Sequence, residues 1–112
     1  MPTVYKVLGR KAAAATTEEE LYTVPSATEA VVSTLVVCNR SASARTYRIA
    51  VKPTAATTLA AEHYIAYDVA IAANDSTALT LGITLAATNA IRVYSSAADA
   101  LTFTAFGSEI TA

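Results

Sequence analysis

The chain has 112 residues, eight basic and nine acidic side chains, a net charge of −1 and a single cysteine, Cys38. This length fits one domain, the dispersed cations exclude a phosphate-binding patch for nucleic acid, and one cysteine excludes an intramolecular disulfide or a cysteine-pair zinc site. Alanine supplies 26 residues, as many as Leu, Ile, Val and Phe together. We therefore expect a thin core, to which contacts between subunits would add stability.

The N-terminal segment has no apolar stretch of signal-peptide length, and no window reaches the roughly 18 to 20 apolar residues of a membrane span. We therefore expect neither a secretion signal nor a membrane partner.

Alternation of apolar and polar residues predicts strands along most of the chain. The first two are expected at residues 3–8 and 21–24, the second of them ended by Pro25, which has no N–H to donate. Residues 30–38 carry apolar side chains on both faces: Val31, Leu35 and Val37 on one, and Val32, Val36 and Cys38 on the other. This pattern indicates a central strand covered on both sides.

Residues 12–20 separate these first strands. Thr17 and Glu20 have the spacing of a helical capping box, but residues 21–24 prefer strands, so we favour a flexible connection over a helix. Such a connection would let the segment 1–10 detach and pair with a neighbouring subunit. Residues 1–20 are therefore predicted as an N-terminal arm and linker of one domain, 1–112.

Five further strands follow. Residues 46–52 direct Tyr47, Ile49 and Val51 to one face and Arg48 and Lys52 to the other. The next strand, 65–71, has Ile65, Tyr67, Val69 and Ile71 in alternation, and the one at 77–85 has Leu79, Leu81, Ile83 and Leu85. The last two lie at 91–94 and 101–104, and turn residues occupy 39–44, 53–61, 73–76 and 88–89. These eight strands predict an all-β fold, a jelly-roll-like antiparallel β-sandwich.

No pattern of residues indicates catalysis. His63 is the single histidine and lacks partners for a zinc cluster; we expect it at the surface, at the end of a strand. A nucleophile paired with it has no motif, and three glycines are too few for a phosphate-binding loop. The remaining candidates are expected to have no catalytic role. Cys38 is expected to be a buried apolar residue. Solvated loop charges are expected for the carboxylates of Glu18, Glu19, Glu20, Asp68, Asp75 and Asp99. We therefore expect no enzyme, no catalytic residue, no cofactor and no metal; a glycan hydrolase would need two carboxylates converging in a cleft.

Tyrosines give a signal for binding, since exposed tyrosines are enriched at protein interfaces and sugar sites. Alternation places Tyr64, Tyr94 and Arg92 away from the inner face, and the predicted arm contains Val4 and Tyr5. These five residues are the predicted interface.

Four stretches carry a family likeness: LYTVPSATEAVVSTLVVCNR, ARTYRIAVKP, HYIAYDVAIAANDSTALTLGITL and FGSEIT. From about Val4 to Thr111 the chain resembles small virion structural proteins of tailed bacteriophages. The resemblance implies a β-sandwich that assembles on the virion, with no catalytic residues. Because the chain is one module long, a capsid decoration (cement) protein that binds the shell in many copies is favoured; the alternative is a tail, baseplate or fibre component that recognises a host receptor.

The same resemblance implies partners and a location. The partners are further copies of the chain, as a homotrimer, and other virion proteins, above all the major capsid protein. The location is the virion, assembled in the host cytoplasm.

Overall fold

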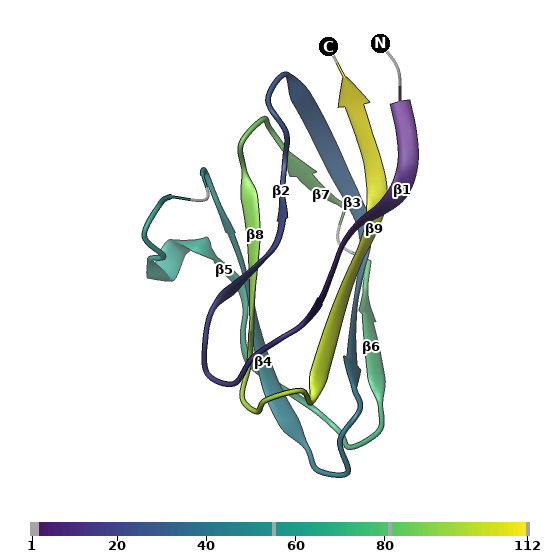
Figure 1. Cartoon of the computed structure of the whole chain (residues 1–112), viewed down its shortest axis with the longest axis vertical. Helices are drawn as coiled ribbons and strands as arrows, with labels where there is room; N and C mark the ends of the chain where they lie inside the picture. The colour runs from purple at the N-terminus through teal and green to yellow at the C-terminus, as the bar shows by residue number, and fades with distance from the viewer. Residues whose placement is uncertain (1–2, 55, 81, 112) are drawn as a thin grey trace.

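The chain folds into two antiparallel sheets that pack as a sandwich (Figure 1). The computed structural model describes residues 3–54, 56–80 and 82–111. Within these ranges the strands are β1 (Thr3–Ala12), β2 (Glu19–Thr23), β3 (Thr28–Asn39), β4 (Arg45–Lys52), β5 (Tyr64–Ile71), β6 (Ser76–Leu79), β7 (Ile83–Leu85), β8 (Ala90–Ser95) and β9 (Leu101–Thr111), and a 3₁₀ turn, η1 (Ala61–His63), precedes β5. No helix in these described ranges is long and apolar enough to cross a membrane.

The strand order confirms the predicted antiparallel sandwich. One sheet has the order β1-β9-β3, with β6 and β7 both pairing with β3, and the other has the order β2-β8-β4-β5. When β6 and β7 are taken as one interrupted strand, this is the order of an eight-stranded jelly roll. The prediction of one continuous strand at 77–85 is wrong. The segment is divided into β6 and β7, and Gly82 between them adopts a positive φ of 63°. Leu81, expected on the inner face, lies outside the described residues.

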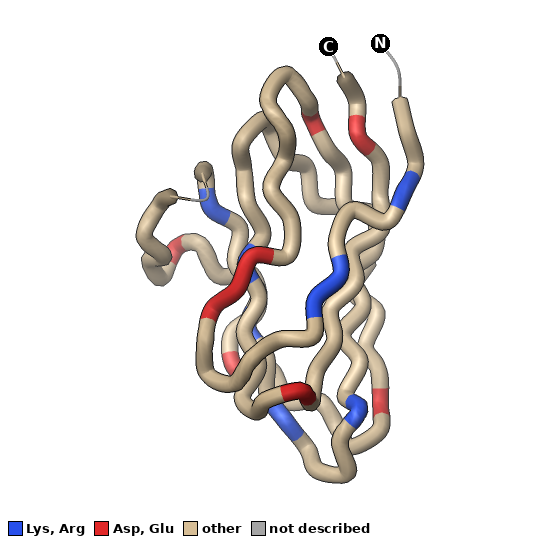
Figure 2. The backbone as a smooth tube through the Cα atoms, viewed as in Figure 1, with Lys and Arg blue, Asp and Glu red and all other residues tan. Residues whose placement is uncertain are grey.

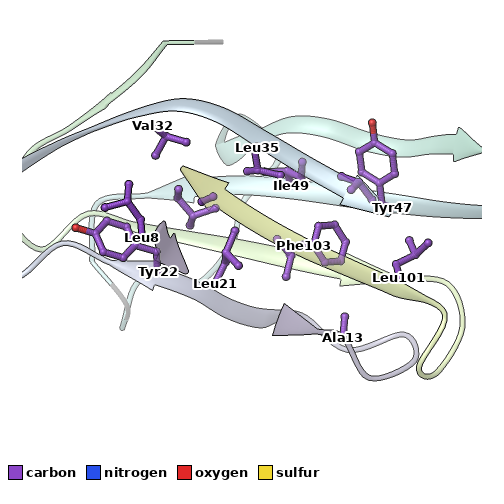
Figure 3. Packing of buried hydrophobic residues seen from close by; sticks show 14 of the residues in the cluster. Leu8, Ala13, Leu21, Tyr22, Val32, Leu35, Tyr47, Ile49, Leu101 and Phe103 are labelled. Carbon is purple, nitrogen blue, oxygen red and sulfur yellow. The ribbon is translucent and has the colours of Figure 1, made fainter. Parts of the chain in front are cut away.

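The core lies between the two sheets and is built from their inward-pointing residues (Figure 3). Tyr47 of β4 and Phe103 of β9 meet edge to face across the interface, with ring centroids 6.3 Å apart. Ala13, Ala30 and Ala105 are also fully buried, so alanine fills positions where a larger side chain would not fit between the sheets.

A β-bulge in β3 overturns the prediction of a strand covered on both sides. Val32 pairs with Gly107 and Thr34 pairs with Phe106, so Ser33 is an extra residue and the alternation shifts at that point. The inner face is therefore formed by Ala30, Val32, Leu35, Val37 and Asn39, all buried. The other residues assigned to a covered face, Val31, Val36 and Cys38, lie half-buried on the outside of the sheet.

The connection before β2 contains no helix, and the capping-box residues Thr17 and Glu20 do not begin one. Backbone hydrogen bonds hold this connection to the domain: Ala13 N–H donates to Leu101 O (3.2 Å) and Thr16 N–H donates to Ser95 O (2.8 Å). Preceding it, β1 pairs with β9 along its length. Residues 3–12 thus belong to the domain's own sheet in this structure, and their exchange between subunits stays a prediction.

Glu109 of β9 joins three strands through its carboxylate. Lys6 Nζ on β1 lies 2.9 Å from one carboxylate oxygen, and the hydroxyl of Tyr22 on β2 donates to the other. These two hydrogen bonds lower the pKa of Glu109 below its ordinary value of about 4.5. Burial and the neighbouring carboxylate raise the pKa of Tyr22, so its hydroxyl remains a donor.

This linkage predicts a pH-dependent role for Glu109 in stability. A carboxyl whose pKa is lower in the folded state stabilises the fold fully above its unfolded pKa and loses that contribution as the pH falls through its folded pKa. We expect E109Q to lose about 1–2 kcal/mol of unfolding free energy at pH 7, and this difference to shrink steadily as the pH is lowered below about 4.5 and the carboxyl becomes protonated in the folded state. Urea denaturation of both proteins between pH 7 and pH 3 measures it. E62Q, which removes a carboxylate without an ion pair among the described residues, is the control. A difference independent of pH would contradict the prediction.

Candidate binding surfaces

The outer face of the four-stranded sheet carries a group of aromatic and charged side chains. Ile49 and Val93 are fully buried, so their neighbours along β4 and β8 point outward. Arg48 is paired directly with Tyr94, and Ala50 with Arg92. Side chains of directly paired residues share one face of the sheet, which places Arg48 beside Tyr94.

Arg48 lies between two tyrosine rings. Its guanidinium carbon is 4.2 Å from the ring centroid of Tyr67 and 4.3 Å from that of Tyr94. Asp68 accepts two hydrogen bonds from Arg48, at 2.7 Å from Nε and 3.3 Å from Nη2, and this pairing raises the pKa of Arg48. Tyr64 packs edge to face on Tyr67, with centroids 4.9 Å apart. We call Arg48, Tyr64, Tyr67, Asp68 and Tyr94 the arginine–tyrosine cluster.

A bulge in β5 brings Tyr67 and Asp68 to Arg48. Tyr47 pairs with Val69 and Ile49 pairs with Ala66, so two residues of β5 lie opposite one residue of β4. Asp68 adopts a positive φ of 52° at this point. The bulge lies on the edge strand of its sheet.

The face predicted as buried in β5 is therefore largely exposed. Ile65, Tyr67 and Val69 are 48%, 57% and 38% exposed, and only Ile71 of that set is buried. The strand was predicted correctly, but its inner face was not.

An open groove adjoins the cluster. It has a volume of about 580 Å³ and is lined by Leu59, Ala60, Ala61, Tyr64 and Tyr67. His63, predicted at a strand end, lies half-exposed at the end of η1 and directly before β5. Its Nδ1 accepts a hydrogen bond from the N–H of Ala60 (2.9 Å), so it closes the turn that forms one wall.

Beside the cluster, Arg92 and Lys52 share one carboxylate. Arg92 Nε lies 3.0 Å and Lys52 Nζ 3.5 Å from Glu18 Oε1. Lys52 also donates to the carbonyl of Thr57 (2.7 Å) and is only 4% exposed, so the outward position predicted for it is covered by the neighbouring loop. Five carboxylates predicted as solvated charges form ion pairs instead: Glu18, Glu19, Glu20, Asp68 and Asp99. Figure 2 shows the three acidic residues 18–20, which lie before and within β2, next to the basic residues of β1.

The predicted interface residues thus separate into two groups. Tyr94 lies against Arg48, Tyr64 reaches it through Tyr67, and Arg92 lies beside them. By contrast, Val4 and Tyr5 lie on β1 in the other sheet, 50% and 84% exposed. The cluster residues that the alternation did not identify are Arg48, Tyr67 and Asp68. Arg48 alone carried a usable signal, as a cation predicted to point outward.

The chemistry of this surface is that of binding. Stacked rings, a guanidinium held in a fixed orientation and an apolar groove can recognise a partner by contact and hydrogen bonding. Among the residues that the structure describes, no three His, Cys, Asp or Glu side chains gather as a metal-ligand set.

Comparison with known proteins returns no match for this chain, whether against protein-family models, curated proteins or solved structures.

Proposed function

We propose that the chain is a non-enzymatic virion structural protein of a tailed bacteriophage, a capsid decoration (cement) protein that binds the shell in many copies and stabilises it. The observation that carries this proposal is the placement of exposed apolar residues on two edge strands. Val4 and Tyr5 lie on β1, and Ile65, Tyr67 and Val69 lie on β5. Exposed apolar residues at sheet edges mark surfaces that bind other proteins.

The two sets lie on opposite sides of the sandwich. β1 packs beside β2. β2 and β5 are the two edge strands of the four-stranded sheet, so β5 lies at the edge away from β1 (Figure 1). A subunit with apolar edges on opposite sides can contact two neighbours at once, which is what reinforcement of a shell requires. A net charge of −1 also keeps repulsion small when identical copies are crowded together.

One observation favours the alternative, a tail, baseplate or fibre component that recognises a host receptor. The arginine–tyrosine cluster and its groove concentrate aromatic and polar groups at one place, as recognition sites do. Tyr67 belongs to both surfaces, but Arg48 and Tyr94 belong only to the cluster, and Ile65 and Val69 belong only to the apolar edge, so variants at these residues can separate the two functions.

The test uses capsid shells of the encoding phage, prepared from a mutant that lacks this chain. Purified protein is added, bound copies are located by electron cryomicroscopy, and the temperature of shell disruption is measured. We expect saturable binding at repeated shell positions and a higher disruption temperature. Replacing two exposed apolar residues of one edge, V4S with Y5S or I65S with V69S, is expected to weaken binding at least tenfold, since each buried apolar side chain contributes about 1–2 kcal/mol.

The matched variant R48K with Y94S alters the cluster and leaves both apolar edges intact. The cement role predicts that it binds shells as the unmodified protein does. Density only at the tail or fibres, or loss of adsorption to host cells in this variant, would contradict the cement role and favour receptor recognition.

A further inference from the structure

The outer face of the five-stranded sheet differs from that of the other sheet because it carries almost no charge. Phe103 and Ala105 are fully buried, so alternate residues of β9 point outward: Thr102, Thr104, Phe106, Ser108 and Ile110. The residues paired with these positions share their face. We call this surface, on β1, β9, β3, β6 and β7, the neutral face.

Apolar side chains occupy the centre of the neutral face. Tyr5 pairs with Ser108, which pairs in turn with Val31, and Val7 pairs with Phe106. Tyr5, Val7, Val31 and Phe106 therefore lie at the strand positions on either side of Gly107 in β9. Tyr5 and Phe106 are 84% and 40% exposed, and diagonal neighbours across strands lie only about 7–8 Å apart, so they form one patch.

Two charges lie at opposite ends of this face. Arg10 on β1 pairs with Thr104, and Glu29 on β3 pairs with Ile110, so they are separated by two strand spacings and by roughly 20 Å along β9. They are the only charged side chains that these five strands, as described, direct outward. Both are exposed, and neither forms an ion pair with any described residue.

We propose that two copies of the chain pack their neutral faces together about a twofold axis that lies in the interface, parallel to both sheets, and passes over β9 near Gly107. Such an axis exchanges the two ends of the face, so Arg10 of each copy meets Glu29 of the other and both ion pairs form together. The apolar patch of one copy then covers that of its partner. A contact of this kind uses the same surface on both copies and closes as a dimer.

The size of the face suits such a contact. With about 3.4 Å per residue along β9 and about 4.8 Å between strands, it measures roughly 700 Å², close to the roughly 800 Å² that each partner buries in a standard interface. Ion pairs at an exposed rim add little affinity, but they fix the orientation of the partners. This proposal does not require the virion role, although both use Tyr5: in the dimer Tyr5 is covered by the partner copy, and Val4 remains as the exposed apolar residue of the β1 edge. It also differs from the homotrimer that the resemblance implies.

Charge reversal with the full chain tests the proposal by sedimentation velocity over a range of concentrations. The unmodified chain is expected to dimerise, and R10E and E29R are each expected to weaken dimerisation about tenfold, because each places like charges opposite one another. The double variant R10E/E29R restores the pairs and the dimer. An equimolar mixture of R10E and E29R is also expected to dimerise, because each copy then meets an opposite charge at both ends.

E62K, a charge reversal on η1 away from the neutral face, is the control and is expected to leave dimerisation unchanged. Y5S with F106S is expected to weaken it at least a hundredfold, with circular dichroism confirming that each variant is folded. A monomer at all concentrations, a trimer, or a double variant as weak as the single ones would overturn the proposal.

Discussion

Replacing Gly107 with alanine is expected to cost roughly 3 kcal/mol or more of unfolding free energy, or to prevent folding. A Cβ at this position would lie 1.9 Å from the carbonyl oxygen of Val31 and 2.9 Å from its carbonyl carbon. These are backbone atoms of the neighbouring strand, next to the bulge at Ser33. Relief of the clash would require β9 and β3 to separate, and with them the centre of the five-stranded sheet.

Urea denaturation monitored by circular dichroism measures this loss, and G82A provides the comparison. A Cβ at Gly82 would meet no atom within 4 Å, but its positive φ of 63° strains any other residue, so a cost of only about 1 kcal/mol is expected. Equal losses in the two variants would show that crowding at Gly107 is not the cause.

Asn39 is the second position where a large effect is expected. It is 1% exposed, and its Nδ2 donates to the carbonyls of Ser43 (2.9 Å), Ile71 (3.3 Å) and Ala72 (3.1 Å). Its Oδ1 accepts from the N–H (2.9 Å) and hydroxyl (2.7 Å) of Ser41. One side chain thus ties the end of β3 to the following loop and to the end of β5. N39A would leave several of these groups without partners, at a cost of about 3 kcal/mol.

The isosteric variant N39D separates hydrogen bonding from packing. It keeps the shape of the side chain but sets a carboxylate against three carbonyl oxygens, so we expect it to be at least as destabilising as alanine. Hydrogen exchange is expected to show the loss of protection at residues 40–44 and 71–72. A fully stable N39D would contradict this account.

The period of two in the sequence was sufficient to predict the strands and the sandwich, because it reports which residues share a face. It could not report which face is covered. In β5 that depends on the strand's edge position and on the bulge at Asp68, which leave Ile65 and Val69 exposed. The bulge at Ser33 is likewise set by pairing with a strand about seventy residues later, and no local pattern marks it.

The candidate surface was predictable to a similar extent. Tyr64 and Tyr94 were expected to point outward, and they do: Tyr94 lies against Arg48, and Tyr64 packs on Tyr67, which also lies against Arg48. That Arg48 joins them follows from β4 lying between β8 and β5, and strand order is a property of the whole fold. Arg92 was identified as an outward cation, but its partner Glu18 comes from the connection before β2, whose path depends on tertiary contacts.

The pairing of Thr3 with Ile110 brings the first and last strands, β1 and β9, to the same end of the sandwich at the start of one and the close of the other (Figure 1). Chains with adjacent ends tolerate circular permutation, in which a short linker joins the ends and new ones are opened in a surface turn such as residues 86–89. In a permuted chain β9 and β1 would form a covalent hairpin, with every strand pairing retained. Such a hairpin could no longer release β1 to another subunit, so the permutant would keep the fold while making strand exchange at this edge impossible.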